Sequence, residues 1–275
     1  MFGKALLPVV RPRPSDTGGL VYDGGSEDDG MIEAGRARSP ATGETYEIKD
    51  GYLDLLKASI GADSPANLTN FLPGAGRGYE PLWRARSLTL LTGESFPNER
   101  ELEIIMSLVR PVRGERYLDL GCSAGLYART LARYLEGGDA VGIDISPSML
   151  READRRARLA ETKPSLVRAN AANLPFIDSS FAGAVCGGSL NEFRDPAQAM
   201  RETHRVLQQG GRLAIMGILR AGTRRGRRLQ RLLSTGGIKF FAPDELHSLL
   251  DHAGFEPDPL ETKGPVFFAS ATRRG

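Results

Sequence analysis

The sequence predicts an α/β protein with a Rossmann-like, seven-stranded, mostly parallel sheet, helices on both of its faces, and a small N-terminal β-hairpin and helical appendage. Three observations lead to this prediction. After Arg116, short apolar runs alternate with helical segments, as in a parallel sheet covered on both faces. A turn of small residues, GCSAG at 121–125, connects the first apolar run to its helix. Asp144 ends the second apolar run, about 20 residues further along the chain.

The composition is that of an ordinary globular protein. Of 275 residues, 40% are hydrophobic and 25% charged, which suffices for one large domain with a small addition. The net charge of +2 favours a small-molecule partner over nucleic acid. No apolar stretch approaches the ~20 residues of a membrane span, and the N-terminal apolar run is too short for a secretion signal. We therefore expect a cytoplasmic protein, and the sequence leaves its oligomeric state open.

Cysteines and histidines are too few to suggest a metal site. Cys122 and Cys186 are the only cysteines, and His204, His247 and His252 are the only histidines. Two cysteines cannot build a disulfide framework, and no spacing suits structural zinc. We expect no metal, two buried thiols, and histidines that pack or lie at the surface.

The N-terminal third divides into two segments. Residues 1–60 begin with a stretch rich in Gly, Asp, Ser, Arg and Pro, which predicts a loop, a short hairpin or partial disorder. Residues 45–56 then alternate as a β-hairpin with its turn at Asp50-Gly51. Residues 61–97 predict a helical cap, in which Phe71, Tyr79 and Trp83 either wall an apolar substrate pocket or pack in a core.

The main domain is expected over residues 98–275. A helix over 99–110 precedes the alternating pattern. The further elements expected are strands at 117–120, 140–144, 165–169, 182–188 and 211–219, and helices at 124–135, 147–160, 196–207 and 243–253. The last apolar run, 265–273, follows a short turn and predicts an antiparallel strand at or near the sheet edge.

The small-residue turn and the aspartate together indicate a cofactor that contains a ribose. Gly121 and Gly125 let the backbone approach a ligand, and the following helix presents free N–H groups. The carboxylate of Asp144 can accept hydrogen bonds from two ribose hydroxyls. Dinucleotide enzymes carry G-x-G-x-x-G at this turn, whereas this chain has G-x-x-x-G, which disfavours NAD.

The segments LDLGCSAG, VGIDISPSML, ANAANLPF and FRDPAQAMRETHRVLQQGGRL resemble, in this order, the motifs of class I S-adenosylmethionine-dependent methyltransferases. The resemblance covers residues 98–272 and is greatest to the methyltransferase type 11 group of ubiquinone and menaquinone biosynthesis. It implies S-adenosylmethionine as the cofactor and S-adenosylhomocysteine as its product. The cofactor-binding residues that it implies are Asp119, Gly121, Cys122, Ser123, Gly125, Asp144, Ile145, Met149, Asn170, Ala171 and Ser189.

The resemblance also implies which of these residues contact which part of the cofactor. The methionine moiety is expected at Asp119, Gly121 and Gly125, and the ribose at Asp144. The adenine is expected beside the segment at 170–171, and Ser189 is expected to face the cofactor.

The chain departs from the family pattern at three positions. Ser123 replaces the usual second glycine, and a hydroxymethyl group is small enough to leave the turn open. Asn170 replaces an aspartate that accepts from the adenine amino group, and its amide oxygen can accept the same bond. Ala182 replaces an aspartate that usually follows Phe181.

Residues 19–56 resemble a small zinc-ribbon module whose metal cysteines have all been replaced. Such ribbons precede some methyltransferase domains, including ribosomal-RNA guanine methyltransferases. The order of segments here is most similar to that of plastid methyltransferase-like proteins. Without cysteines the module gains no folding energy from zinc, so it must lean on the main domain or stay loose.

Two residues after the fourth strand of the main domain are candidate catalytic groups. Glu192 can act as a general base where the acceptor must lose a proton, or simply as a helix-capping or solvent-facing carboxylate. Asn191 can orient an acceptor, but satisfying a turn is the favoured interpretation.

The segment 220–231 carries six arginines after the fifth strand, where this fold often inserts a cap over the substrate. Arg224 is the candidate substrate contact among them. The cluster can bind phosphate or an anionic membrane surface, or form a solvated cationic helix face, which is the slightly favoured interpretation.

The expected function is methyl transfer to a small, apolar acceptor such as a quinone, an isoprenoid or another lipid-like metabolite. The ribbon remnant and the arginines suggest an RNA (rRNA guanine) methyltransferase as an alternative, which the near-neutral charge opposes. Ser123 and Asn170 suggest a second alternative, a non-catalytic cofactor-binding protein.

Overall fold

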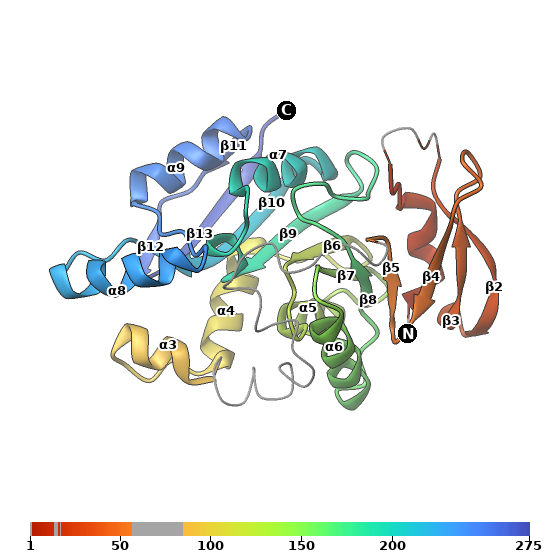
Figure 1. The fold of residues 1–275 in the computed structure, drawn as a ribbon, viewed down its shortest axis with the longest axis horizontal. Helices are drawn as coiled ribbons and strands as arrows, with labels where there is room; N and C mark the ends of the chain where they lie inside the picture. The colour runs from red at the N-terminus through yellow and green to blue at the C-terminus, as the bar shows by residue number, and fades with distance from the viewer. Residues whose placement is uncertain (1, 14–15, 17, 57–84) are drawn as a thin grey trace.

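The computed structural model describes residues 2–13, 16, 18–56 and 85–275 (Figure 1). One hydrogen-bonded sheet of 13 strands runs through these residues. The strands are β1 (Phe2–Gly3), β2 (Val21–Asp28), β3 (Met31–Arg38), β4 (Thr45–Lys49), β5 (Tyr52–Asp54), β6 (Arg116–Leu120), β7 (Asp139–Asp144), β8 (Ser165–Arg168), β9 (Phe181–Gly187), β10 (Leu207–Ile218), β11 (Phe255–Pro257), β12 (Glu261–Lys263) and β13 (Val266–Arg273).

The expected seven-stranded sheet, called the central sheet below, forms one continuous part of this larger sheet and ends at its edge strand β11. Its strand order is β8-β7-β6-β9-β10-β13-β11. The first five strands pair in parallel, whereas β13 pairs antiparallel with both β10 and β11. The prediction of a parallel core with a final antiparallel strand near the edge is therefore confirmed. The central strands are buried almost throughout, as near-continuous apolar runs require.

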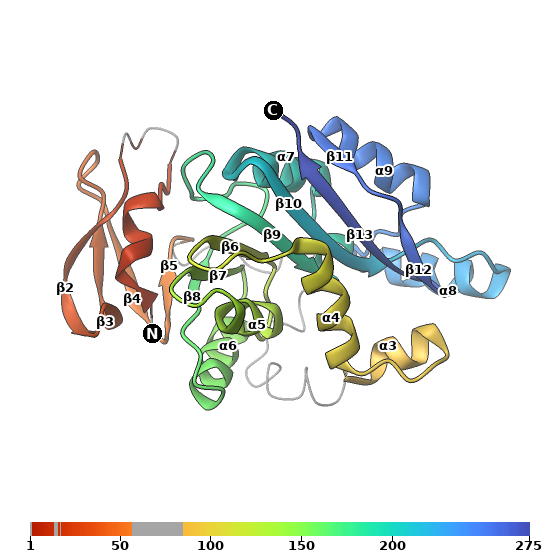
Figure 2. The ribbon, with the colours of Figure 1, turned by 180° about the vertical axis from the view of Figure 1, so that it is seen from behind.

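Helices cover both faces of this central sheet, as predicted. The described part of the chain contains the helices α3 (Ala85–Thr92), α4 (Asn98–Val109), α5 (Leu126–Tyr134), α6 (Pro147–Leu159), α7 (Pro196–Val206), α8 (Arg224–Thr235) and α9 (Pro243–His252), and the short 3-10 helices η1 (Lys4–Val9) and η5 (Ser189–Asn191). Helices α4 and α5 pack into one apolar cluster, and α7 and α9 pack into another (Figure 1 and Figure 2). Both α6 and α7 begin with a proline, preceded by a residue, Ser146 or Asp195, whose side chain caps the helix.

The strands of the N-terminal segment extend the central sheet. β5 pairs in parallel with β8, and β4, β3, β2 and β1 continue outward from it. The side chains of Phe2, Leu6 and Leu7 are buried in the same apolar cluster as those of α7 and α9. The segment thus leans on the main domain, one of the two outcomes expected of a ribbon without zinc. The division at residue 60 lies outside the described residues.

The hairpin predicted around Asp50-Gly51 is confirmed. Ile48 pairs with Leu53, and both turn residues have positive φ, 52° at Asp50 and 83° at Gly51. This is the conformation of the two-residue turns that favour Asp-Gly. A Cβ at Gly51 would also lie 2.2 Å from the carboxyl carbon of Asp154, so the turn needs glycine for space as well.

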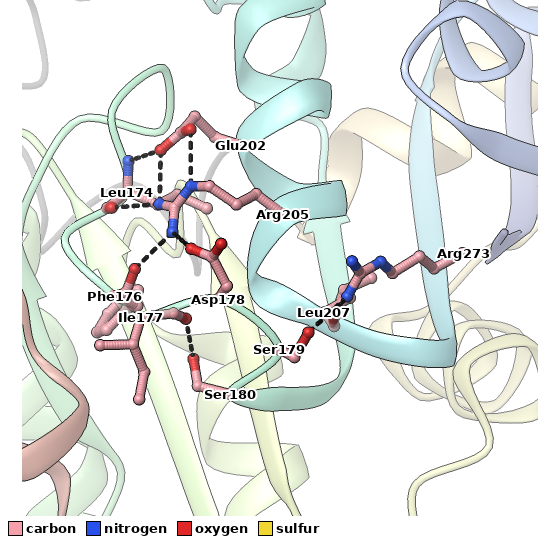
Figure 3. A network of polar contacts seen from close by, with 10 residues as sticks. All are labelled: Leu174, Phe176, Ile177, Asp178, Ser179, Ser180, Glu202, Arg205, Leu207 and Arg273. Carbon is pink, nitrogen blue, oxygen red and sulfur yellow. Dashed lines mark hydrogen bonds and ion pairs between the residues drawn. The ribbon is translucent and has the colours of Figure 1, made fainter. Parts of the chain in front are cut away.

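Arg205 of α7 fastens the loop between β8 and β9 to the body of the protein (Figure 3). Its guanidinium donates to the carbonyls of Leu174 (2.9 Å) and Phe176 (2.7 Å). It also forms ion pairs with Asp178 and Glu202. Glu202 in turn accepts from the Leu174 N–H at 2.8 Å. The loop that follows β8 is therefore held at several points.

Both cysteines are buried, as predicted, and none of the described helices is long and apolar enough to cross a membrane. The ring of His204 packs edge-on against Phe255, which confirms a packing role. Burial lowers the pKa of this histidine.

Candidate functional site

The candidate site lies where β6, β7 and β9 end. Three residues of the turn after β6 have positive φ: Gly121 at 64°, Ser123 at 49° and Gly125 at 74°. A Cβ at Gly121 would lie 2.6 Å from both Cβ and Oγ of Ser189, so only glycine fits there. The Ser189 hydroxyl closes this contact by donating to the Gly121 carbonyl at 2.7 Å. The end of β9 and the turn after β6 therefore form one unit.

Ser123 sits in the left-handed region, which costs a residue with a Cβ ~1–2 kcal/mol. This explains why a glycine is usual at this position of the motif. The backbone N–H of Ser123 donates to Asp144 Oδ2 at 2.9 Å, so the turn remains tied to the end of β7. The departure from the family pattern thus leaves the turn intact.

Asp144 is the half-buried carboxylate at the end of β7. Its Oδ2 accepts from the N–H of Ser123, and its Oδ1 accepts from the N–H of Ser146 at 2.8 Å. Burial raises its pKa, and the backbone N–H bonds oppose that rise. Each carboxylate oxygen has a second lone pair, so the group can still accept from two adjacent hydroxyls. This matches the role predicted for it toward a ribose.

Asp119 is buried under the turn and holds the first turn of α5. Its Oδ2 accepts from the Ala128 N–H at 2.9 Å. A carboxylate near the N-terminus of a helix is favoured by the helix dipole. The structure thus gives Asp119 a part in fixing the turn, whereas its contact with a methionine moiety stays a prediction.

The Cys122 side chain points away from the open face of the turn. Its thiol packs in a small apolar cluster with Tyr52, Leu150 and Leu166, and burial raises its pKa. Any contact of Cys122 with a cofactor therefore falls to its backbone. Met149 is also buried, with its sulfur 3.5 Å from Ser123 Oγ, in the first turn of α6.

The segment at 170–171 follows β8 and lies at the same edge of the sheet as the ends of β6 and β7. The Asn170 side-chain oxygen accepts from the Ala172 N–H at 2.9 Å and so shapes a local turn. This uses one lone pair of the oxygen, and the other remains for a ligand. Ala171 is buried, and Ile145, directly after Asp144, is half-buried. Their roles toward a cofactor stay predictions.

Glu192 follows η5 and is half-buried, and its carboxylate has no hydrogen bond to another described residue. Burial, and next the negative charge of Asp144, raise the pKa of Glu192 to about 7. A carboxyl group with this pKa exchanges a proton readily at neutral pH. The structure therefore gives Glu192 the electrostatic properties of a general base.

Asn191 is buried, and both its amide nitrogen and its amide oxygen bond to the backbone. Its Nδ2 donates to the carbonyls of Ile218 (2.9 Å) and Lys239 (2.6 Å), and its Oδ1 accepts from the Ile218 N–H (2.9 Å). No donor is left to orient an acceptor. The structure thus gives Asn191 a part in satisfying backbone groups, whereas any role toward an acceptor stays a prediction.

We expect Asn191→Ala to lower the free energy of unfolding by about 2–3 kcal/mol, because it leaves buried backbone groups of Ile218 and Lys239 without partners. Urea denaturation measures this change. Unchanged stability together with lost activity would contradict the structural assignment and restore a catalytic one.

Sequence reasoning missed Arg168, which stabilises the loop after β7. Its Nε donates to the Ile145 carbonyl at 3.1 Å, and its guanidinium forms an ion pair with Asp54 at 3.1 Å. Both side chains are largely buried. Asp54 belongs to the N-terminal segment and is 114 residues away in sequence, so no local pattern indicated this pair.

The predicted substrate contacts are only partly described. Tyr79, Trp83 and Phe71 lie outside the described residues. Arg224 is exposed in the first turn of α8, the helix that follows β10.

Comparison with known proteins identifies the class. Residues 118–215 match the family described as Methyltransferase domain. The chain is 30% identical over 190 residues to the demethylmenaquinone methyltransferase of Thermotoga maritima, a match that covers 61% of this chain and 80% of that protein. It is 26% identical to an uncharacterized chloroplastic methyltransferase of Arabidopsis thaliana, over 90% of this chain and 75% of that protein.

A solved structure shows the same fold. Phosphoethanolamine N-methyltransferase 2 of Haemonchus contortus, in complex with S-adenosyl-L-methionine, superimposes with a TM-score of 0.63 at 15% identity, covering 80% of this chain and 61% of that one. The chain belongs to the class I S-adenosylmethionine-dependent methyltransferases. The match to the chloroplastic protein extends over the N-terminal segment, whereas the likeness of that segment to a zinc ribbon stays a prediction.

Proposed function

We propose that this methyltransferase transfers the methyl group of S-adenosylmethionine to a small, apolar acceptor such as a quinone, an isoprenoid or another lipid-like metabolite. The observation that carries the proposal is the pair of carboxylates beside the glycine turn. In this proposal Asp144 holds the ribose, and Glu192, whose pKa is raised to about 7, takes a proton.

The residues present fit the cofactor. The left-handed Gly121 and Gly125 expose the backbone of the turn, and Asp144 offers free lone pairs one strand away. When bound, S-adenosylmethionine supplies a methyl group on a sulfonium, which is already an activated leaving group. The proposed reaction therefore needs alignment of the acceptor more than further activation, and it includes no metal.

In this proposal Glu192 removes a proton from the acceptor, which alignment of the acceptor alone would not achieve. An acceptor that carries a hydroxyl or an acidic C–H must lose a proton as the new bond to the methyl group forms. The Glu192 carboxylate accepts that proton. Loss of its own charge on protonation is favourable, because its surroundings are partly buried and Asp144 is negative.

The apolar acceptor is supported by the relative from Thermotoga maritima, which is named for a quinone of this kind. A naphthoquinol with an isoprenoid tail has both the apolar body and the acidic hydroxyls that the site can use.

Methyl transfer to such an acceptor tests the proposal. The purified protein is incubated with S-adenosylmethionine labelled in its methyl group and with either a prenylated naphthoquinol or total RNA. We expect label in the organic extract with the quinol, and none on RNA. Label on RNA alone would contradict the proposal and favour the RNA methyltransferase alternative.

A further inference from the structure

Helix α8 exposes an apolar stripe that no described residue covers. Leu229, Leu232 and Leu233 are 59%, 68% and 41% exposed. Among the described residues only eight large hydrophobic side chains are exposed to this degree, and three of them lie on this one helix. Their spacing, i, i+3 and i+4, places all three on one side of the helix. The stripe is therefore concentrated, unlike the single exposed apolar residues that are normal at a surface.

The same helix is rich in arginine. Arg224, Arg225, Arg228 and Arg231 are exposed, and none forms an ion pair with another described residue. The sequence from 220 to 236 contains no aspartate or glutamate. The helix thus carries strong positive charge that the described part of the protein leaves unbalanced.

Two contacts fix the position of α8 in the described part of the chain. Gln230 accepts from the Ala221 N–H at 2.7 Å and donates to the Leu219 carbonyl at 2.8 Å, which fixes the helix to the end of β10. Thr223 caps its first turn by accepting from the Gly226 N–H at 3.1 Å. Figure 1 and Figure 2 show α8 extending outward from the body of the protein. Because β10 is parallel to β9 and β6, its end lies at the edge of the sheet that carries the candidate site.

We infer that α8 docks on the surface of an anionic lipid bilayer, with its leucines in the interface and its arginines at the lipid phosphates. An apolar stripe together with strong positive charge on one exposed helix is the pattern of an interfacial helix on an anionic membrane. RNA would use the arginines but not the leucines, and residues 220–236 contain no aromatic side chain for base stacking. The inference rests on the proposed function in one respect: an apolar acceptor dissolves in a bilayer, which gives membrane docking a use.

Sedimentation with lipid vesicles tests the inference. The whole protein, without cofactor or acceptor, is mixed with vesicles of phosphatidylcholine alone or with added phosphatidylglycerol. We expect binding to the vesicles that contain phosphatidylglycerol, little binding to phosphatidylcholine alone, and weaker binding at high salt.

Two sets of variants separate the leucines from the arginines. Leu229→Gln/Leu232→Gln/Leu233→Gln is expected to lower the vesicle partition coefficient by at least about 100-fold, since three apolar side chains lose their insertion. Arg228→Gln is expected to lower it about fivefold. All four side chains are exposed, so circular dichroism should show an unchanged fold.

Matched controls exist elsewhere on the chain. Leu159→Gln removes a leucine that is 74% exposed on α6, and Arg36→Gln removes an exposed arginine on β3. Neither should change vesicle binding. Equal vesicle binding by the triple leucine variant and the wild type would overturn the inference. So would binding to RNA but not to vesicles, or a leucine-dependent dimer in sedimentation velocity. A triple variant that still methylates a water-soluble acceptor leaves the proposed function intact, so the two failures are distinguishable.

Discussion

Glu192→Gln is expected to lower kcat by about 10²- to 10⁴-fold, which is the usual contribution of a general base. The substitution keeps the size of the side chain and removes only its ability to take a proton. Because Glu192 makes no hydrogen bond to another described residue through its carboxylate, stability and cofactor affinity should change little. Steady-state methyl transfer and calorimetric titration with S-adenosylhomocysteine, on the same preparation, measure both.

The pH dependence gives a second, independent sign of the same role. Only the ionised form of Glu192 accepts a proton, so the activity of the wild type should rise with pH through about 7, the pKa of this group. In Glu192→Gln this rise should disappear. A variant with wild-type kcat and an unchanged pH profile would show that Glu192 takes no part in the reaction. The acceptor would then lose no proton to this residue.

Asp144→Ala is expected to weaken binding of S-adenosylhomocysteine by about 1–3 kcal/mol, or roughly 5- to 150-fold. The ribose hydroxyls would lose their charged acceptor, and the N–H of Ser123 would lose the bond that ties the glycine turn to β7. Burial raises the pKa of Asp144, so wild-type affinity should fall on acidification at a higher pH than for an ordinary aspartate.

Two further variants make this result specific. Asp144→Asn keeps one acceptor but turns an amide N–H₂ toward a backbone N–H, so it should also weaken binding. Asp139→Ala lies at the other end of the same strand, where the carboxylate pairs with Arg116, and it should leave the affinity unchanged. Equal affinity of Asp144→Ala and the wild type for S-adenosylhomocysteine would contradict the assignment of Asp144 to the ribose.

The parallel core could be predicted from the sequence because each of its units carries its own local signal. Pro147 and Pro196 open helices directly after capping residues, and the Asp50-Gly51 turn is favoured by its own backbone conformation. The cofactor turn was equally predictable, because the positive φ of Gly121 and Gly125 is a local backbone feature that favours glycine.

The parts that could not be predicted depend on contacts between distant segments. Strand β2 is exposed along almost its whole length, so no apolar alternation marks it, and it forms by pairing with β3. The parallel pairing of β5 with β8 joins residues more than 100 positions apart. Asn191 bonds to backbone groups of Ile218 and Lys239, and only the folded chain shows that these occupy both of its N–H donors. Likewise, the leucines of α8 look like core residues until the fold leaves them exposed.

Calorimetric titration of S-adenosylhomocysteine into the wild-type protein, with NAD titrated in parallel, tests the central claim most directly. We predict one site with a dissociation constant in the micromolar range, about −8 kcal/mol of binding free energy, and no heat from NAD. Absence of S-adenosylhomocysteine binding by the folded protein would contradict the account, because the glycine turn and Asp144 would then hold no cofactor of this class.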